Sequence, residues 1–183
     1  MITDRERQKA LDSLTRSRQA LLDAVEGVSE GQARWKPAPE RWSIFEYVEH
    51  LAVADDALIA LVEKSLKTPP QPETEEQRRA REAKIRATPI PRGVNRAPET
   101  MQPRGRFATL TEAVAAFLAA RDRTLEYART TTDDLRSHFS PHPVLGPLDA
   151  YQWLTGNAHH AETHAGHIRE LRALPGFASE PRP

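Results

Sequence analysis

Apolar residues recur at steps of three and four positions along four stretches of the chain, and polar or charged residues fill the positions between them. Because an α-helix has 3.6 residues per turn, this spacing collects the apolar side chains on one helical face. The first stretch predicts a helix over residues 4–27, which Thr3 or Asp4 can cap and which the segment GVSEGQ ends. Its apolar positions are Leu11, Leu14, Leu21, Val25 and Val28.

The second predicted helix spans residues 43–67 and has a clear start. Ser43 and Glu46 have the spacing of a capping box, and the prolines of KPAP exclude a helix directly before it. Trp42 precedes the cap, where its ring can pack on Tyr47 as a hydrophobic staple, and we favour this role over a part in binding a ligand. The segment TPPQP ends the helix.

Two further helices are predicted in the second half of the chain. Thr109 and Glu112 repeat the capping-box pattern and begin a helix over residues 109–130. The segment SPHPVLGPLDA, studded with Pro and Gly, is expected to be a loop. The last helix, over residues 148–173, follows this loop and ends before Pro175.

Residues 68–108 have a different composition from the predicted helices on either side. They hold seven of the fifteen prolines, placed around the charged segment ETEEQRRAREAKIRA, which can form a short solvated helix. A connection of this length inside a compact domain indicates a lid-like excursion or a partly mobile segment. Its charges are expected to form an exposed face rather than a binding patch.

Four long helices without a convincing strand predict an all-α protein, a four-helix bundle with the long connection between its second and third helices. A chain of 183 residues suits one domain, so residues 1–183 are expected to form a single bundle that includes the 68–108 excursion.

Composition excludes several classes of function. The chain has no cysteine, so any metal ion must be held by His, Asp or Glu. Lys and Arg balance Asp and Glu at 26 each, so no strong field attracts nucleic acid or an anionic membrane. No stretch approaches the roughly 20 apolar residues that span a bilayer, and the amino terminus lacks the apolar run of a signal peptide. We therefore expect a cytoplasmic protein that binds neither nucleic acid nor membrane.

The last predicted helix contains four of the seven histidines within nine positions. His160, His164 and His167 are three, four and seven residues apart, so they share one helical face, whereas His159 is expected to face solvent or a helix flank. Two imidazoles at positions i and i+4 can bind one cation, although such a pair alone is more often incidental.

A further histidine on the second helix strengthens the interpretation of a metal site. His50 lies on the apolar side, between Tyr47 and Ala54, while Glu49, Asp55 and Asp56 are expected to turn elsewhere. Alone, His50 is most simply a hydrogen-bonded core residue. Because two helices of one bundle both turn histidine inward, however, we favour a shared metal site, and neutral nitrogen ligands suit Zn²⁺ or Ni²⁺. A di-iron carboxylate site is rejected because its Glu-x-x-His pattern is missing.

The segments RWSIFEYVEHLA and HAETHAGHIREL, together with HPVLGPLDAYQWL, resemble the DinB/YfiT-like superfamily of metal-binding four-helix bundles. The resemblance implies that the metal ligands are His50, His160 and His164, the residues that the helical faces had selected. The family often has Gln where this chain has His167. His167 could occupy a fourth metal position, hydrogen-bond a metal-bound water, or support the ligands from outside the coordination sphere.

The resemblance also implies a function, a divalent-metal-dependent thiol transferase that joins a low-molecular-weight thiol to a small electrophile. Because the chain has no cysteine, the reactive sulfur would come from a cofactor, and His167 or Tyr47 could assist proton transfer. A hydrolase that uses the same three histidines and a non-catalytic metal-binding protein are the alternatives. The residues do not identify the catalytic groups. The partner implied is a small-molecule substrate, and a homodimer is possible on the habit of the family.

Overall fold

The structure is a computed structural model, and it describes residues 1–87 and 97–177. Within these ranges six α-helices, one short 3₁₀-helix and a two-stranded sheet are formed. In chain order the elements are α1 (Asp4–Val25), α2 (Glu30–Arg34), α3 (Ile44–Leu66), α4 (Glu75–Ala87), η1 (Glu99–Met101), α5 (Leu110–Thr130), β1 (Phe139–His142), β2 (Gly146–Asp149) and α6 (Ala150–Arg172).

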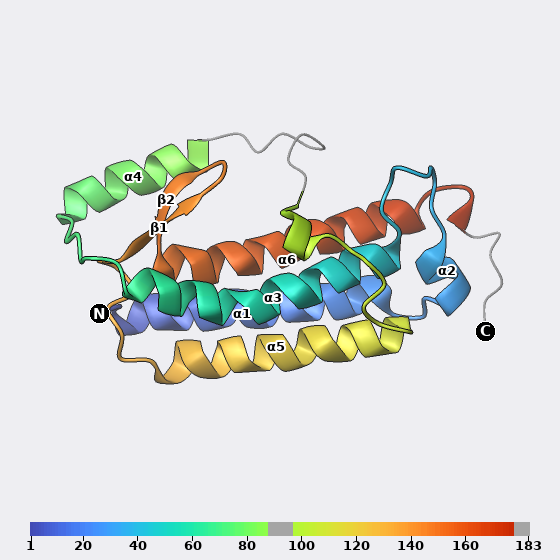
Figure 1. Cartoon of the computed structure of the whole chain (residues 1–183), viewed down its shortest axis with the longest axis horizontal. Coiled ribbons are helices and arrows are strands. Elements are labelled where there is room, and N and C mark those ends of the chain that lie inside the picture. Colours follow the sequence, from blue (N-terminus) through green and yellow to red (C-terminus); the bar gives the residue numbers. More distant parts are fainter. Residues whose placement is uncertain (88–96, 178–183) are drawn as a thin grey trace.

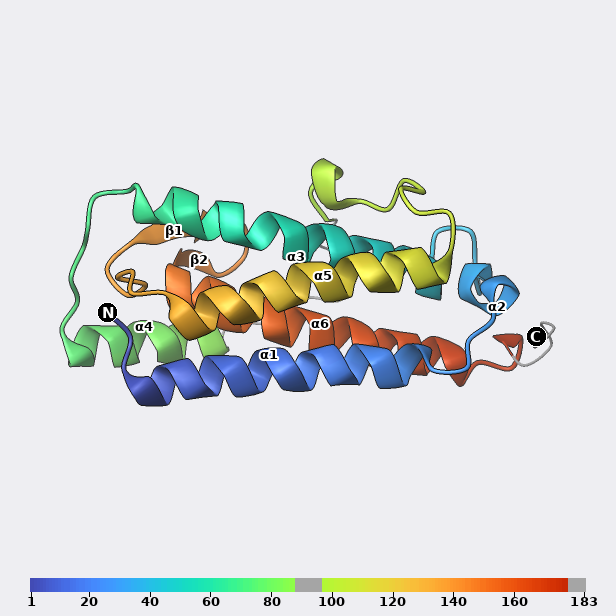
Figure 2. The ribbon, with the colours of Figure 1, turned by 90° about the horizontal axis from the view of Figure 1, so that it is seen from below.

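Four long helices, α1, α3, α5 and α6, form the predicted bundle (Figures 1 and 2). Helix α1 packs against α5 and α6, and α3 packs against the same two helices, so α1 and α3 lie on opposite sides of the bundle. Following the chain in Figure 1, α1 and α6 run in one direction, and α3 and α5 run in the other. The connection from α3 to α5 therefore returns along the length of the bundle.

Side-chain caps fix the starts of the long helices. Thr3 caps α1, Ser43 caps α3 and Asp149 caps α6, and in each case the residue three positions later completes a capping box. Thr109 also caps α5 by accepting from the backbone N–H of Glu112. The second bond of the predicted capping box, from the N–H of Thr109 to the carboxylate of Glu112, is replaced. That carboxylate accepts from the N–H of Ala108 instead.

The long connection is more ordered than a bare loop along the parts that the structure describes. Its charged segment forms α4, as expected, but one face of this helix is not solvated: Arg81 is 14% exposed and donates to the carboxylates of Glu73 and Asp149. The expectation that these charges form only an exposed face is therefore wrong for Arg81. Residues 88–96 of the predicted excursion lie outside the described ranges.

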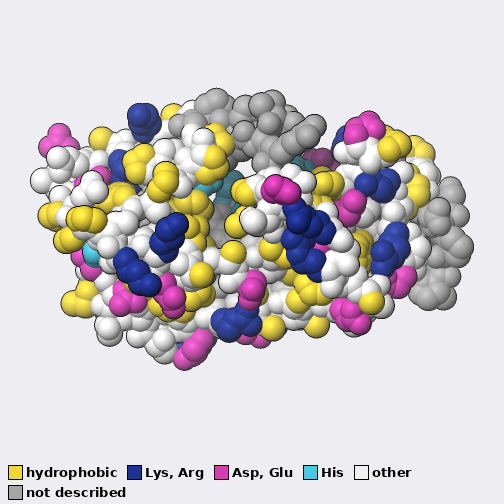
Figure 3. All heavy atoms as spheres, in the orientation of Figure 1, with side chains coloured by type: hydrophobic (Ala, Val, Ile, Leu, Met, Phe, Trp, Pro, Cys, Tyr) yellow, Lys and Arg dark blue, Asp and Glu magenta, His cyan; other side chains and the backbone are white. Residues whose placement is uncertain are grey.

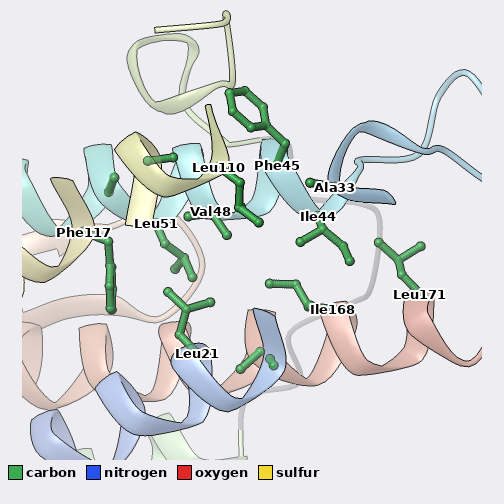
Figure 4. Packing of buried hydrophobic residues seen from close by; sticks show 14 of the residues in the cluster. Leu21, Ala33, Ile44, Phe45, Val48, Leu51, Leu110, Phe117, Ile168 and Leu171 are labelled. Atoms are coloured by element: carbon green, nitrogen blue, oxygen red, sulfur yellow. The ribbon is translucent and has the colours of Figure 1, made fainter. Parts of the chain in front are cut away.

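Side chains from all four long helices form the core. Figure 4 shows Leu21 of α1, Leu51 of α3, Phe117 of α5 and Ile168 of α6 pointing toward one another, and all four are fully buried. Ala33 of α2 joins this cluster at one end of the bundle. At about 25 cal/mol for each Å² of apolar surface removed from water, this interior provides the main driving force for folding.

Several short elements, α2, η1 and the strands β1 and β2, were not predicted. The short helix α2 begins at a capping box formed by Ser29 and Gln32, where the sequence had indicated only the end of the first helix. Part of SPHPVLGPLDA, expected to be a loop, forms the antiparallel hairpin β1–β2, in which Pro141 faces Pro147. Gly146 begins the returning strand with a φ of 80°, which favours glycine. No helix in the described part of the chain is long and apolar enough to cross a membrane.

Candidate metal centre

Helices α3 and α6 pack against each other and bring three predicted ligands together. His50 lies in the second turn of α3, and His160 and His164 lie on consecutive turns of α6. One ring nitrogen from each of these three residues lies within 4.8 Å of the others. The structure therefore brings together the three histidines that the sequence had selected as candidate ligands.

The tautomer of His50 is fixed by the backbone. Its Nδ1 lies 2.8 Å from the carbonyl oxygen of Met101, and because a carbonyl only accepts, Nδ1 carries the hydrogen of the neutral ring. The lone pair of His50 Nε2 consequently points into the cluster, where Nε2 of His160 is 3.1 Å away. Nε2 of His160 is in turn 2.9 Å from Nε2 of His164.

These two nitrogen–nitrogen contacts cannot both be ordinary hydrogen bonds. His50 Nε2 has no hydrogen, so His160 Nε2 would have to donate to it. Having donated, the same nitrogen has no lone pair left for His164 and could only share its one hydrogen between both neighbours. A single cation placed among three lone pairs would satisfy all three nitrogens at once.

All three rings are electrically neutral near pH 7. Burial, and to a lesser extent the charges of neighbouring basic groups, lowers the pKa of His160 to about 3 and that of His164 to about 2. Burial also lowers the pKa of His50, while its hydrogen bond to Met101 acts in the opposite direction. Neutral imidazole is the form that binds metal ions.

The remaining histidines of α6 have separate positions. His159 is exposed, as expected. The Nδ1 of His167 lies 3.3 Å from the Nδ1 of His164, which is the nitrogen that faces away from the three-histidine cluster. This places His167 behind His164, as a support for that ring rather than as part of the converging set.

Two aromatic rings cover the cluster on one side. The ring centre of Trp42 is 5.3 Å from that of Tyr47, so the predicted staple is confirmed. The ring centre of Trp42 is also 5.0 Å from that of His50 and 6.3 Å from that of His164. Tyr47 also contacts His164 and His167, at 5.2 and 5.6 Å between ring centres. Burial raises the pKa of Tyr47, so its hydroxyl keeps its proton at neutral pH.

Glu49 and Asp55 turn away from the cluster, as expected, but neither reaches solvent. Both are almost completely buried and have found partners in other elements. Asp55 accepts two hydrogen bonds from Arg121 of α5, at 2.8 and 2.9 Å, and neither side chain of this pair is exposed. Glu49 accepts hydrogen bonds from the backbone of residues 104–106.

The contact between His50 and Met101 was not predicted. It depends on a backbone carbonyl of η1, and a carbonyl is present at every residue, so the sequence carried no signal for it.

The histidine cluster is accessible from outside, because His160 and His164 keep part of their surface exposed. Figure 3 shows histidine side chains at the bottom of a hollow in the upper middle of this face.

Two known proteins are similar to this chain. The protein YuaE of Bacillus subtilis strain 168, described as uncharacterized, is 22% identical over 148 residues, which make up 81% of this chain and 88% of YuaE. YfiT from Bacillus subtilis, described as "a probable metal-dependent hydrolase with an unusual four-helix bundle topology", has a similar structure. The TM-score is 0.62 at 19% identity, over 94% of this chain and 89% of YfiT, which shows that the fold is shared.

A model of the DinB superfamily matches residues 13–168, which is most of the chain. This agrees with the family that the two histidine-bearing segments had indicated. The protein belongs to the DinB superfamily.

Proposed function

We propose that His50, His160 and His164 bind one divalent metal ion through their Nε2 atoms and that the protein is a metal-dependent enzyme acting on a small molecule. The observation that carries the proposal is the convergence of three Nε2 atoms whose two contacts, at 3.1 and 2.9 Å, lack enough hydrogens to be separate hydrogen bonds. Ligands on a tetrahedral zinc ion, each about 2.0–2.1 Å from the metal, are about 3.3 Å apart, which is close to these separations.

The surroundings of the ligands support this assignment. Metal-binding histidines commonly donate their second ring N–H to a carbonyl or another acceptor, which fixes the tautomer and the ring orientation. The Met101 carbonyl has this relation to His50, and the Nδ1 of His167 has the position to do the same for His164. We therefore favour a role for His167 in supporting His164 from outside the coordination sphere, rather than as a fourth ligand or as a partner of a metal-bound water.

An ion held by three neutral imidazoles keeps its full charge, so it would lower the pKa of a water molecule or a thiol that it binds and would favour the nucleophilic anion. The residues of the chain would provide the environment for this reaction. Trp42 and Tyr47 place aromatic rings against one side of the cluster. Because Tyr47 stays protonated at neutral pH, it would act as a hydrogen-bond donor to substrate rather than as a base.

Transfer of a low-molecular-weight thiol to a small electrophile is the reaction that we propose first, on the strength of the family resemblance. The absence of cysteine from the chain means that the sulfur would arrive with the thiol substrate. Hydrolysis at the same site is the second candidate, because the structurally similar YfiT is described as a probable metal-dependent hydrolase. In the first reaction a thiol is the nucleophile, and in the second it is water.

Metal content tests the binding site. The protein is stripped with a chelator, loaded with Zn²⁺ or Ni²⁺, desalted and analysed by mass spectrometry of the elements. We expect one ion per chain in the wild-type protein and in His159→Ala, whose altered side chain is exposed and adjacent. We expect His160→Ala to lose most of the bound metal. Equal loading of all three proteins would show that these histidines do not form the site.

Activity is then measured on the loaded protein in two arms. Monochlorobimane is offered with a panel of thiols in one arm, and a set of simple esters and amides is offered without thiol in the other. Conjugation that requires both metal and thiol supports the transferase, and turnover in the second arm alone supports the hydrolase. No metal-dependent turnover in either arm, with metal binding intact, would favour the non-catalytic alternative.

A further inference from the structure

The carboxylate of Glu49 is held by three consecutive backbone N–H groups. Its Oε1 accepts from the N–H of Arg104 at 2.8 Å and of Arg106 at 3.2 Å, and its Oε2 accepts from the N–H of Gly105 at 3.0 Å. Consecutive N–H groups that point at one anion form a nest, and a residue of positive φ allows the turn. Gly105 has a φ of 73°, which fits this geometry.

Arg106 links this nest to the segment that touches His50. Its Nη1 donates to Glu49 Oε1 at 2.9 Å and to the carbonyl of Gln102 at 2.7 Å, and its Nη2 donates to the carbonyl of Thr100 at 2.9 Å. Thr100 and Gln102 are the residues on either side of Met101. The guanidinium therefore holds both neighbours of the carbonyl that accepts from His50 Nδ1.

Glu49 and His50 are adjacent on α3, so the residue that accepts from the nest and the residue that contacts Met101 lie in the same turn of one helix. The carboxylate is completely buried, and the hydrogen bonds that it accepts include one from a guanidinium, which makes that bond charge-assisted. Four donors in all surround this buried carboxylate. Its position beside a histidine whose tautomer depends on the same loop suggests a more specific role.

We propose that Glu49 and Arg106 are positioning residues for His50: together they hold the Met101 carbonyl against His50 Nδ1 and so keep the Nε2 lone pair directed at the metal site. The inference rests on the proposed metal site, but its tautomer component does not require metal. Loss of a group that directly holds a metal ligand, as the Met101 carbonyl holds His50, typically lowers metal affinity by roughly 10- to 100-fold. A purely structural tether would change stability without changing the tautomer of His50.

Arg106→Ala is the main variant, because its side chain reaches the surface and its removal should leave the fold intact. Arg104→Ala is the matched control: its backbone N–H stays in the nest, while its side chain is 52% exposed and pairs with Glu99 instead. Zinc affinity is measured by competition with a chromophoric chelator. We expect an approximately 10-fold or greater loss for Arg106→Ala, and less than a twofold change for Arg104→Ala.

The tautomer is read separately, by long-range ¹H–¹⁵N NMR of the histidine rings in the metal-free protein. We expect His50 to carry its hydrogen on Nδ1 in the wild type and in Arg104→Ala, and to lose this preference in Arg106→Ala. Glu49→Gln should behave like Arg106→Ala if it folds. In a His50→Ala background, Arg106→Ala should cause no further loss of zinc affinity, because the ligand through which it acts is missing.

The outcomes separate the two proposals. If the wild-type protein binds zinc and Arg106→Ala matches it in both affinity and His50 tautomer, the positioning role is refuted and the metal site stands. If the wild-type protein binds no zinc but Arg106→Ala still changes the His50 tautomer, the metal site is refuted and the link through Met101 stands. An equal loss of zinc affinity in Arg104→Ala would also refute the positioning role.

Discussion

The buried histidines should make the metal-free protein lose stability between pH 7 and pH 5. His160 and His164 have pKa values of about 3 and about 2 in the folded chain, whereas an unfolded histidine titrates near 6.5. As the pH falls below 6.5, the unfolded chain binds protons that the folded chain does not. The stability contributed by these neutral rings is therefore complete above about pH 6.5 and is lost progressively as the pH falls toward 3.

The size of the effect follows from the two pKa values. For one group that is protonated only in the unfolded chain, a change from pH 7 to pH 5 lowers the free energy of unfolding by about 2 kcal/mol. His160 and His164 together give about 4 kcal/mol. This is an upper value because both rings keep part of their surface in contact with solvent. It is still a large part of the roughly 5–15 kcal/mol that stabilises a typical domain.

The assay is urea unfolding, followed by circular dichroism, at pH 7, 6 and 5 in the presence of a chelator. The double variant His160→Gln/His164→Gln removes both titrating rings and should reduce the dependence on pH by up to about 4 kcal/mol over this range. Other titrating groups are common to both proteins, so their contributions cancel in the comparison. His159→Gln, altered at an exposed position, should behave as the wild type does. If the wild type and the double variant lose stability equally, the two rings are not held neutral as the structure indicates.

Three further predictions concern the bundle that carries the site. Arg121→Met should lower the free energy of unfolding by about 3–5 kcal/mol, because it leaves Asp55 buried without its partner. The double variant Asp55→Leu/Arg121→Met should recover most of this loss in urea unfolding, and no recovery would contradict the explanation. Ser43→Ala should cost about 1 kcal/mol by removing the cap of α3, visible as a lower thermal midpoint, whereas an unchanged midpoint would show that the cap is dispensable. Phe117→Ala should cost about 3–5 kcal/mol in urea unfolding because the ring is completely buried, and a loss below 1 kcal/mol would show that the core closes around the gap.

The sequence predicted the first three long helices well because each combines an apolar repeat with a side-chain cap, whereas α6 was predicted from the loop before it and from Pro175 after it. The capping box of Ser43 and Glu46, for example, begins α3 where expected. The β1–β2 hairpin was missed because each strand has only four residues and contains a proline, and neither shows the alternation of apolar and polar positions that indicates a strand. Pro141 and Pro147 even face each other in the pairing register.

The candidate ligands were also accessible from sequence, for a geometric reason. His160 and His164 are four residues apart on one helix, and His50 interrupts an apolar stripe on another, so helical periodicity alone directs all three inward. The groups behind the ligands were not accessible in the same way. Glu49 was expected only to turn away from the stripe, because the sequence cannot show that a backbone segment more than fifty residues later supplies its partners.

The topology of the bundle accounts for that segment. Since α3 and α5 run in the same direction, the chain must return the full length of the bundle between them (Figure 1). A helix of 23 residues is about 35 Å long, so a short turn cannot make this connection. The returning chain passes over α3 near His50, where η1 presents the Met101 carbonyl and the following residues enclose Glu49. A returning chain that did not pass over this part of α3 would leave the histidines without this support. We therefore expect shortening of the 97–108 segment to weaken metal binding while leaving the four long helices formed.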